Sequence, residues 1–182
     1  SIENEAKHGH RVKLIAVTKT RDVQTIKNAY ECGVRSLGEN RVQEAESKFE
    51  SFEKMPSLEK RFIGHLQSNK VKKCLSLFDT IDSIHSLKIA KRINNQLIQE
   101  NKKIKTLLEV NMSGDEQKHG FSPENTEEML RSISFNALGV EGLMTIGPAS
   151  RNEKETRKAF EGLRVLKEKL NNEIKKEALT EL

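Results

Sequence analysis

The segment VKLIAVTK, residues 12–19, decides the fold. Its centre, Leu14 to Val17, is an unbroken apolar run, as expected of a parallel β-strand that is covered on both faces. An amphipathic helix is predicted next, from about Asp22 to Cys32, with Gly33 as the residue that ends it. The segment from Arg35 to Glu39 again predicts a strand. A strand, a helix and a second strand in this order form the basic unit of an α/β fold.

The same alternation of apolar strands and amphipathic helices continues along the chain. We expect strands at about 12–19, 35–39, 61–66, 80–84, 104–110 and 139–146, and helices at about 22–32, 42–52, 71–78, 86–100, from the N-cap Ser122 onward, and 153–172. Six such units in order predict a parallel sheet with right-handed crossovers.

Two architectures fit this pattern, a doubly wound open sheet and a (β/α)8 TIM barrel. A doubly wound nucleotide-binding sheet usually has a glycine-rich turn after its first strand. Here that turn is TKTRDV, residues 18–23, without glycine, and the chain has no P-loop motif. We therefore expect an α/β fold of the barrel type. A barrel needs eight units, so the chain is expected to be a barrel truncated to about six.

Composition limits the class of protein. The 182 residues suit one domain, the net charge is +5 with both signs interspersed, and aromatic residues make up only 4%. No apolar run reaches the roughly 18 residues of a membrane helix, and residues 1–10 lack the apolar stretch of a signal peptide. We expect a cytoplasmic monomer that binds neither membrane nor nucleic acid. Cys32 and Cys74 lie on apolar helix faces and are expected to be buried thiols.

Ligands of parallel barrels bind where the strands end, and Lys19 ends the first predicted strand. A lysine that is partly desolvated there has a lowered pKa, and its neutral amine can form a Schiff base with a carbonyl. The alternative is a lysine that ends the strand and points to solvent. His65 follows the third strand and could be a ligand donor, an acid–base group or a structural residue. His8 and His10 have no third ligand at metal spacing, so no metal site is expected.

Six motifs in order resemble one known family. They are AVTKT at 16–20, GENRVQE at 38–44, RFIGHLQSNK at 61–70, DSIHSLKIAKRIN at 82–94, EVNMSGDEQKHGF at 109–121 and GLMTIGP at 142–148. This set is similar to the pyridoxal phosphate homeostasis proteins, the YggS/PROSC family, and covers the chain from about Val12 to Leu182.

The resemblance implies a barrel of pyridoxal phosphate fold-type III, related to the N-terminal domain of alanine racemase. It also implies that Lys19 holds pyridoxal 5'-phosphate as a Schiff base and that Asn40 and Met144 line the cofactor pocket with His65 as a neighbour. The function implied is buffering and delivery of the cofactor to apoenzymes, without strong catalysis. The alternative is a racemase-like enzyme of low activity. Racemisation needs two opposed bases. The resemblance to alanine racemase implies that the second base would be a tyrosine from another domain, whereas the single tyrosine here, Tyr30, lies in a predicted helix.

One departure from the family pattern concerns the end of the sequence. Family members continue beyond the position of Leu182 with segments that supply strands 7 and 8, the cofactor phosphate site and an arginine near the pyridine nitrogen. Residues 1–182 are therefore expected to be a single alanine racemase N-terminal-like barrel domain that lacks these last strands.

Overall fold

A curved sheet of six parallel strands forms the centre of the computed structural model, which describes residues 12–52, 54–115, 117–150, 152–175 and 178–182. The strands are β1 Ala16–Val17, β2 Ser36–Glu39, β3 Glu59–Phe62, β4 Thr80–Ile84, β5 Ile104–Glu109 and β6 Leu138–Met144. Each strand pairs in parallel with the next one along the chain. A doubly wound sheet reverses its strand order at a switch point, so this unbroken order confirms the barrel-type α/β arrangement.

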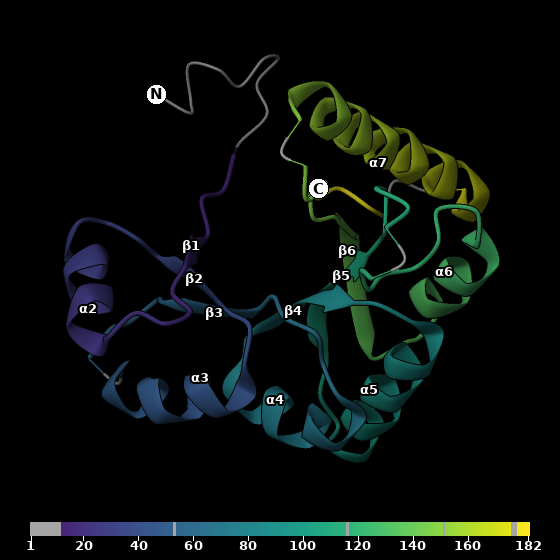
Figure 1. Cartoon of the computed structure of the whole chain (residues 1–182). Helices are drawn as coiled ribbons and strands as arrows, with labels where there is room; N and C mark the ends of the chain where they lie inside the picture. The colour runs from purple at the N-terminus through teal and green to yellow at the C-terminus, as the bar shows by residue number, and fades with distance from the viewer. Residues whose placement is uncertain (1–11, 53, 116, 151, 176–177) are drawn as a thin grey trace.

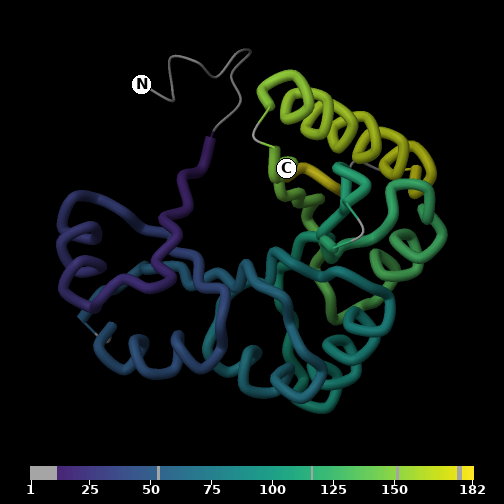
Figure 2. Tube along the Cα trace, in the orientation of Figure 1, coloured from purple at the N-terminus to yellow at the C-terminus, as the bar shows by residue number. Residues whose placement is uncertain are grey.

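The helices lie outside the sheet and follow one another around it in chain order (Figure 1). They are α2 Val23–Glu31, α3 Val42–Phe49, α4 Val71–Leu77, α5 Leu87–Gln99, α6 Thr126–Ile133 and α7 Glu153–Ile174, with short 3-10 turns η2 Glu50–Phe52 and η3 Ser68–Lys70. Figure 2 shows the chain curving from α2 around to α7, with the strands on the inside of the curve. None of the described helices is long and apolar enough to cross a membrane.

After α7 the chain returns to the sheet on the free side of β6. Glu181 forms a parallel bridge with Gly142. The amides of Thr180 and Glu181 donate to the Glu141 carbonyl at 2.8 and 2.9 Å. A Cβ on Gly142 would overlap the Glu181 carbonyl, so a glycine is required at this contact. The sheet therefore continues past β6 in the order that a barrel needs, with Leu179 fully buried beside it.

The hydrophobic core fills the layer between the strands and the helices. Leu37, Phe62, Ile81, Ile84, Leu108 and Leu143 enter it from the sheet, and Ile26, Ala45, Ile93, Met129, Leu163 and Leu170 from the helices. Phe78 makes edge contacts with Phe49 and Phe62, each with ring centroids 5.2 Å apart. These contacts fix α3 and α4 against β3.

Several boundaries differ from the sequence-based expectation. β1 is confined to Ala16–Val17, since it pairs only with β2 among the described strands and leaves Leu14 and Val17 64% and 50% exposed. β3 begins two residues early, at Glu59, because Glu59 pairs with Ser36 of β2, and it ends at Phe62 instead of Leu66. The N-cap of α6 is Asn125, whose side chain accepts from the Glu128 amide, and Ser122 was the wrong choice.

The two cysteines also differ from each other. Cys74 is fully buried in α4, but Cys32 is exposed, because it is the C-cap residue of α2 and lies beyond the face that packs on the sheet. The expectation of a buried thiol is therefore wrong for Cys32. Burial raises the pKa of the Cys74 thiol to about 12. This thiol is therefore unreactive for two reasons, because reagents cannot reach it and because it stays protonated.

Thiol labelling should report this difference. In the native chain, one equivalent of a thiol reagent should react rapidly, at Cys32, and the second only on unfolding. Cys32→Ser should abolish the fast reaction, and Cys74→Ser should leave it unchanged. Two thiols reacting at the same rate in the native chain would contradict the packing of α4.

Candidate functional site

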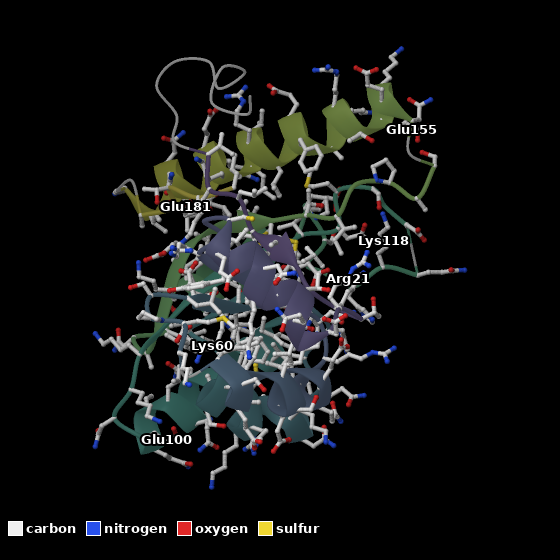
Figure 3. All side chains as sticks on the ribbon, turned by 90° about the vertical axis from the view of Figure 1, so that its left-hand side faces the viewer. Arg21, Lys60, Glu100, Lys118, Glu155 and Glu181 are labelled. Atoms are coloured by element: carbon white, nitrogen blue, oxygen red, sulfur yellow. The ribbon has the colours of Figure 1, made fainter. Side chains whose placement is uncertain are left out.

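A cavity of about 600 Å³ lies at the carboxyl ends of the strands. This volume is within the range of small-molecule sites. Figure 3 shows Arg21, Lys118 and Glu155, which follow β1, β5 and β6, on one side of the molecule, and Lys60, Glu100 and Glu181 on the other. The cavity lies on the first of these sides. Its lining combines apolar strand residues with polar residues from the loops, among them Val17, Lys19, Asn40, Gly64, His65, Asp82, Leu107, Glu109, Asn111, Lys118, His119 and Met144.

All four residues that the sequence singled out line this one cavity. Lys19 comes from the end of β1, Asn40 from the end of β2, His65 from the loop after β3, and Met144 from the end of β6. Lys19 is exposed, so the burial expected for it is absent, because β1 is the outermost described strand on its side of the sheet. Whether these residues bind a ligand stays a prediction.

A buried polar network lies directly under Lys19. The Lys48 ammonium of α3 donates to Glu39 Oε1 at 2.8 Å, to Glu44 Oε1 at 2.7 Å and to the Thr18 carbonyl at 2.9 Å. Thr18 Oγ1 donates to the same Glu39 oxygen at 2.7 Å. Burial by itself would lower the pKa of Lys48, but its hydrogen bonds to Glu39 and Glu44 outweigh that and raise it, so Lys48 is held as a cation.

The network also constrains the residue after Lys19. Thr20 has φ 64°, in the left-handed region, which is rare for a β-branched residue. Its amide donates to Glu44 Oε1 at 2.5 Å. Lys19 is therefore fixed on both sides, through the Thr18 carbonyl and through the Thr20 amide, and such local strain persists only where the surroundings hold it.

A second buried ion pair crosses from β3 to β4 beneath the cavity. Arg61 donates to both oxygens of Asp82, at 2.7 and 2.9 Å. Glu59 accepts a further bond from Arg61 at 3.0 Å, and Thr80 Oγ1 donates to Asp82 at 3.1 Å. The side chains of Arg61 and Asp82 are only 11% and 3% exposed. This bidentate pair holds the side chain of Asp82, which lines the cavity, in a fixed position.

A close backbone contact joins the loops after β2 and β3. A Cβ on Gly64 would overlap the carbonyl of Asn40, so the two loops touch there with no room for a side chain. The Ile63 amide donates to the Glu39 carbonyl at 3.0 Å, and Ser83 Oγ donates to the Gly64 carbonyl at 2.6 Å. These bonds bring Asn40 and His65 to the same wall of the cavity.

Three histidines from three successive loops stack beside this wall. The ring centroids of His65 and His119 are 3.8 Å apart, and those of His65 and His85 are 4.2 Å apart. Burial lowers the pKa of His85 to about 4, and the charge of the neighbouring His65 adds to this effect. Burial also lowers the pKa of His65, with a smaller contribution from the charge of His119. No motif in the sequence linked His85 or His119 to another residue. The feature that the three histidines share is that each lies in the loop after a strand.

Glu109 was missed by sequence reasoning. It is the last residue of β5, pairs with Met144 of β6 and lines the cavity at 7% exposure. Burial raises its pKa to about 7. Its signal in the sequence is a charged residue that directly ends an apolar strand, LLE at 107–109, which is the same signal that identified Lys19.

Metal binding finds no support in the part of the chain that the structure describes. No group of three or more His, Cys, Asp or Glu side chains there has an arrangement suited to a metal ion. His8 and His10 lie outside the described residues.

Comparison with known proteins gives a consistent result. Residues 2–180 match the family model described as "Alanine racemase, N-terminal domain". The chain is 37% identical to the pyridoxal phosphate homeostasis protein of Aquifex aeolicus over 162 residues, which are 88% of this chain and 71% of that protein. The structure of PipY from Synechococcus elongatus with PLP bound has a TM-score of 0.87 at 30% identity and covers 100% of this chain and 84% of that one.

More distant structures agree on the fold. An alanine racemase from Clostridium difficile has a TM-score of 0.77 at 18% identity, over 94% of this chain and 48% of that one. At this identity the likeness concerns the fold alone. It is consistent with the strand order β1 to β6 described above.

Breaking the ion pair beneath the cavity should destabilise the fold. Asp82→Asn leaves a buried guanidinium short of its main partner, and we expect a loss of about 3 kcal/mol in the free energy of unfolding, the low end for a buried pair, because Glu59 remains. Urea denaturation would measure this loss. The matched control is Glu46→Gln, which breaks the Lys73–Glu46 pair of half-exposed side chains and should cost less than about 1 kcal/mol. Equal effects would contradict the burial of Arg61.

The stability of the fold should fall in mild acid because of His85. Its folded pKa of about 4 lies below the usual value of about 6.5. Between pH 6.5 and 4 the unfolded chain therefore binds more protons, so the free energy of unfolding decreases as the pH falls. His85→Gln should make this slope shallower between pH 6.5 and 5 in urea titrations, whereas His119→Gln, at an exposed ring, should change it less. An unchanged slope in His85→Gln would show that His85 is not held neutral.

Proposed function

Because the chain belongs to the family of pyridoxal phosphate homeostasis proteins, we propose that it binds pyridoxal 5'-phosphate and serves its homeostasis by buffering and delivering it. In this proposal Lys19 holds the cofactor as a Schiff base, and Asn40, His65 and Met144 line its pocket. The single observation that carries the proposal is that these four residues, from four different strand ends, line one cavity at the mouth of the barrel.

The residues present fit such a cofactor. The cavity volume of about 600 Å³ suits a small substituted ring. Its walls offer an exposed amine at Lys19, apolar surface at Val17, Leu107 and Met144, and a buried carboxyl group at Glu109. When bound, pyridoxal phosphate supplies an aldehyde that can react with an amine.

The chain itself supplies placement of that amine. Lys48, held between Glu39 and Glu44, fixes the backbone carbonyl of Thr18, and Glu44 fixes the amide of Thr20. The backbone of Lys19 is thereby set while its side chain stays free to reach an aldehyde. Carrier function requires release as well as binding, and an exposed lysine is accessible both to an arriving cofactor and to a competing amine.

Binding is favoured over racemisation by the position of Tyr30. Racemisation at a Cα requires a second base that faces Lys19 across the substrate. Tyr30, the single tyrosine of the chain, lies in α2 on the outside of the sheet, and its hydroxyl donates to the Pro56 carbonyl at 2.8 Å. It is therefore not placed to be that base.

The proposal extends to the setting of the protein. We propose that the chain works in the cytoplasm as a monomer, with apoenzymes that require pyridoxal phosphate as its partners. We also propose that residues 1–182 belong to a single barrel domain of the alanine racemase N-terminal type. The bridge from Glu181 to Gly142 supports this, because it marks the position next to β6 where a further strand would continue the sheet.

Reductive trapping would test Lys19. The chain is mixed with pyridoxal phosphate, treated with borohydride and mapped by peptide mass spectrometry. We expect one label on Lys19, and no label and loss of the visible absorbance change in Lys19→Ala. The matched control is Lys118→Ala, which removes another lysine of the same cavity and should leave the Lys19 label in place.

Two outcomes would overturn the assignment. One is a label on Lys118 or another lysine of the wild-type chain instead of Lys19. The other is undiminished cofactor binding by Lys19→Ala.

A further inference from the structure

Glu109 is a buried acid that faces the candidate site. Within β5, Leu108 lies in the hydrophobic core, whereas Leu107 and Glu109 line the cavity. Glu109 is 93% buried, since only 7% of it is exposed. Its backbone carbonyl is already used, accepting from the Phe121 amide at 2.8 Å. The side chain therefore remains as the part of Glu109 available to a molecule in the cavity.

No partner for this carboxyl group is found among the described residues. The titratable groups that line the same cavity are Lys19, His65, Asp82, Lys118 and His119, and none makes a hydrogen bond or ion pair with Glu109. Asp82 is taken by Arg61, and the Lys118 ammonium donates to the Gly147 carbonyl at 2.8 Å. Consistently, the shift in the Glu109 pKa has burial as its cause and no contribution from a charged neighbour.

An unpaired carboxylate is costly in such a position. The residues that the structure describes offer it no cation, so the neutral carboxylic acid is the form that burial favours. A carboxylic acid has an O–H that can donate a hydrogen bond, which an ionised carboxylate lacks. A buried acid kept neutral in this way can serve as a donor to an anionic oxygen. The same contact would be repulsive if Glu109 were ionised.

We propose that Glu109 binds the ligand of this cavity as a neutral carboxylic acid that donates a hydrogen bond to an anionic oxygen of the ligand, so that binding takes up a proton wherever free Glu109 is ionised. This inference rests on the proposed function, which supplies an anionic ligand. The proton comes from solvent and stays on the carboxyl group, and no other bond changes. The anionic oxygen can belong to the ring hydroxyl of the cofactor or to its phosphate.

We expect the affinity of the wild type for pyridoxal phosphate, relative to that of Glu109→Gln, to depend on pH. Pyridoxal phosphate affinity is measured by absorbance for the wild type and for Glu109→Gln from pH 6 to pH 9. The amide of Gln keeps a hydrogen-bond donor but cannot ionise. The ratio of wild-type to variant affinity should therefore fall as the pH rises through 7, approaching tenfold per pH unit for one coupled proton. Groups common to both proteins, including Lys19, cancel in this ratio.

A second variant and a control complete the design. Glu109→Leu removes the donor, so its affinity at pH 6 should be about tenfold or more below that of the wild type, which tests the contact even if one variant folds poorly. Glu127→Gln makes the same chemical change at an exposed position of α6 and should give a ratio that does not vary with pH. Pyridoxal, which lacks the phosphate, distinguishes the two oxygens. If the pH effect of Glu109→Gln persists with pyridoxal, the acceptor is on the ring.

Failure of the proposed function and failure of the role of Glu109 would give different results. If the wild-type chain gives no absorbance change with pyridoxal phosphate at any pH, the proposed function fails. If the wild type binds but its affinity ratio to Glu109→Gln is constant from pH 6 to 9, or if Glu109→Leu binds as tightly as the wild type at pH 6, the role of Glu109 is overturned while the proposed function stands.

Discussion

The ammonium group of Lys48 is the interaction on which the site most depends. It joins α3 to β2 through Glu39 and to the end of β1 through the Thr18 carbonyl. β1 contains only two residues and pairs with one neighbour, so its strand hydrogen bonds alone hold it weakly. The buried cation supplies the missing anchor, and the position of Lys19 follows from it. Removing the Lys48 ammonium would leave the buried carboxylate of Glu39 without a cation.

Most of the fold could be predicted from the sequence, because local patterns carried the information. The continuous apolar run from Leu14 to Val17 indicated a strand, and the glycine-free turn around Lys19 argued against the nucleotide-binding alternative. Boundaries were less predictable because they depend on neighbours in space. β1 is short because it lies at the edge of the described sheet, and Cys32 is exposed because α2 ends there.

The lining of the cavity was predictable at Lys19, where a single residue at a strand end carried the signal, and at Asn40 and Met144 through the family resemblance. It was not predictable where the chemistry arises from several loops. The stacking of His65 with His85 and His119 requires three loops to meet. The burial of Glu109 depends on β6 and on the loop that ends at Phe121. Lys19 is exposed although burial was expected. The reason is that β1 has a neighbouring strand on only one side among the described strands.

The contact between Gly64 and Asn40 has a consequence for how such a site can diverge. With no space for even a methyl group at residue 64, the loops after β2 and β3 form one rigid unit at the mouth of the barrel. A substitution in one loop that moves its backbone must be matched by a change in the other. Sequence variation should therefore be correlated between these two loops, and the wall of the cavity that Asn40 and His65 form should change only when both loops change together.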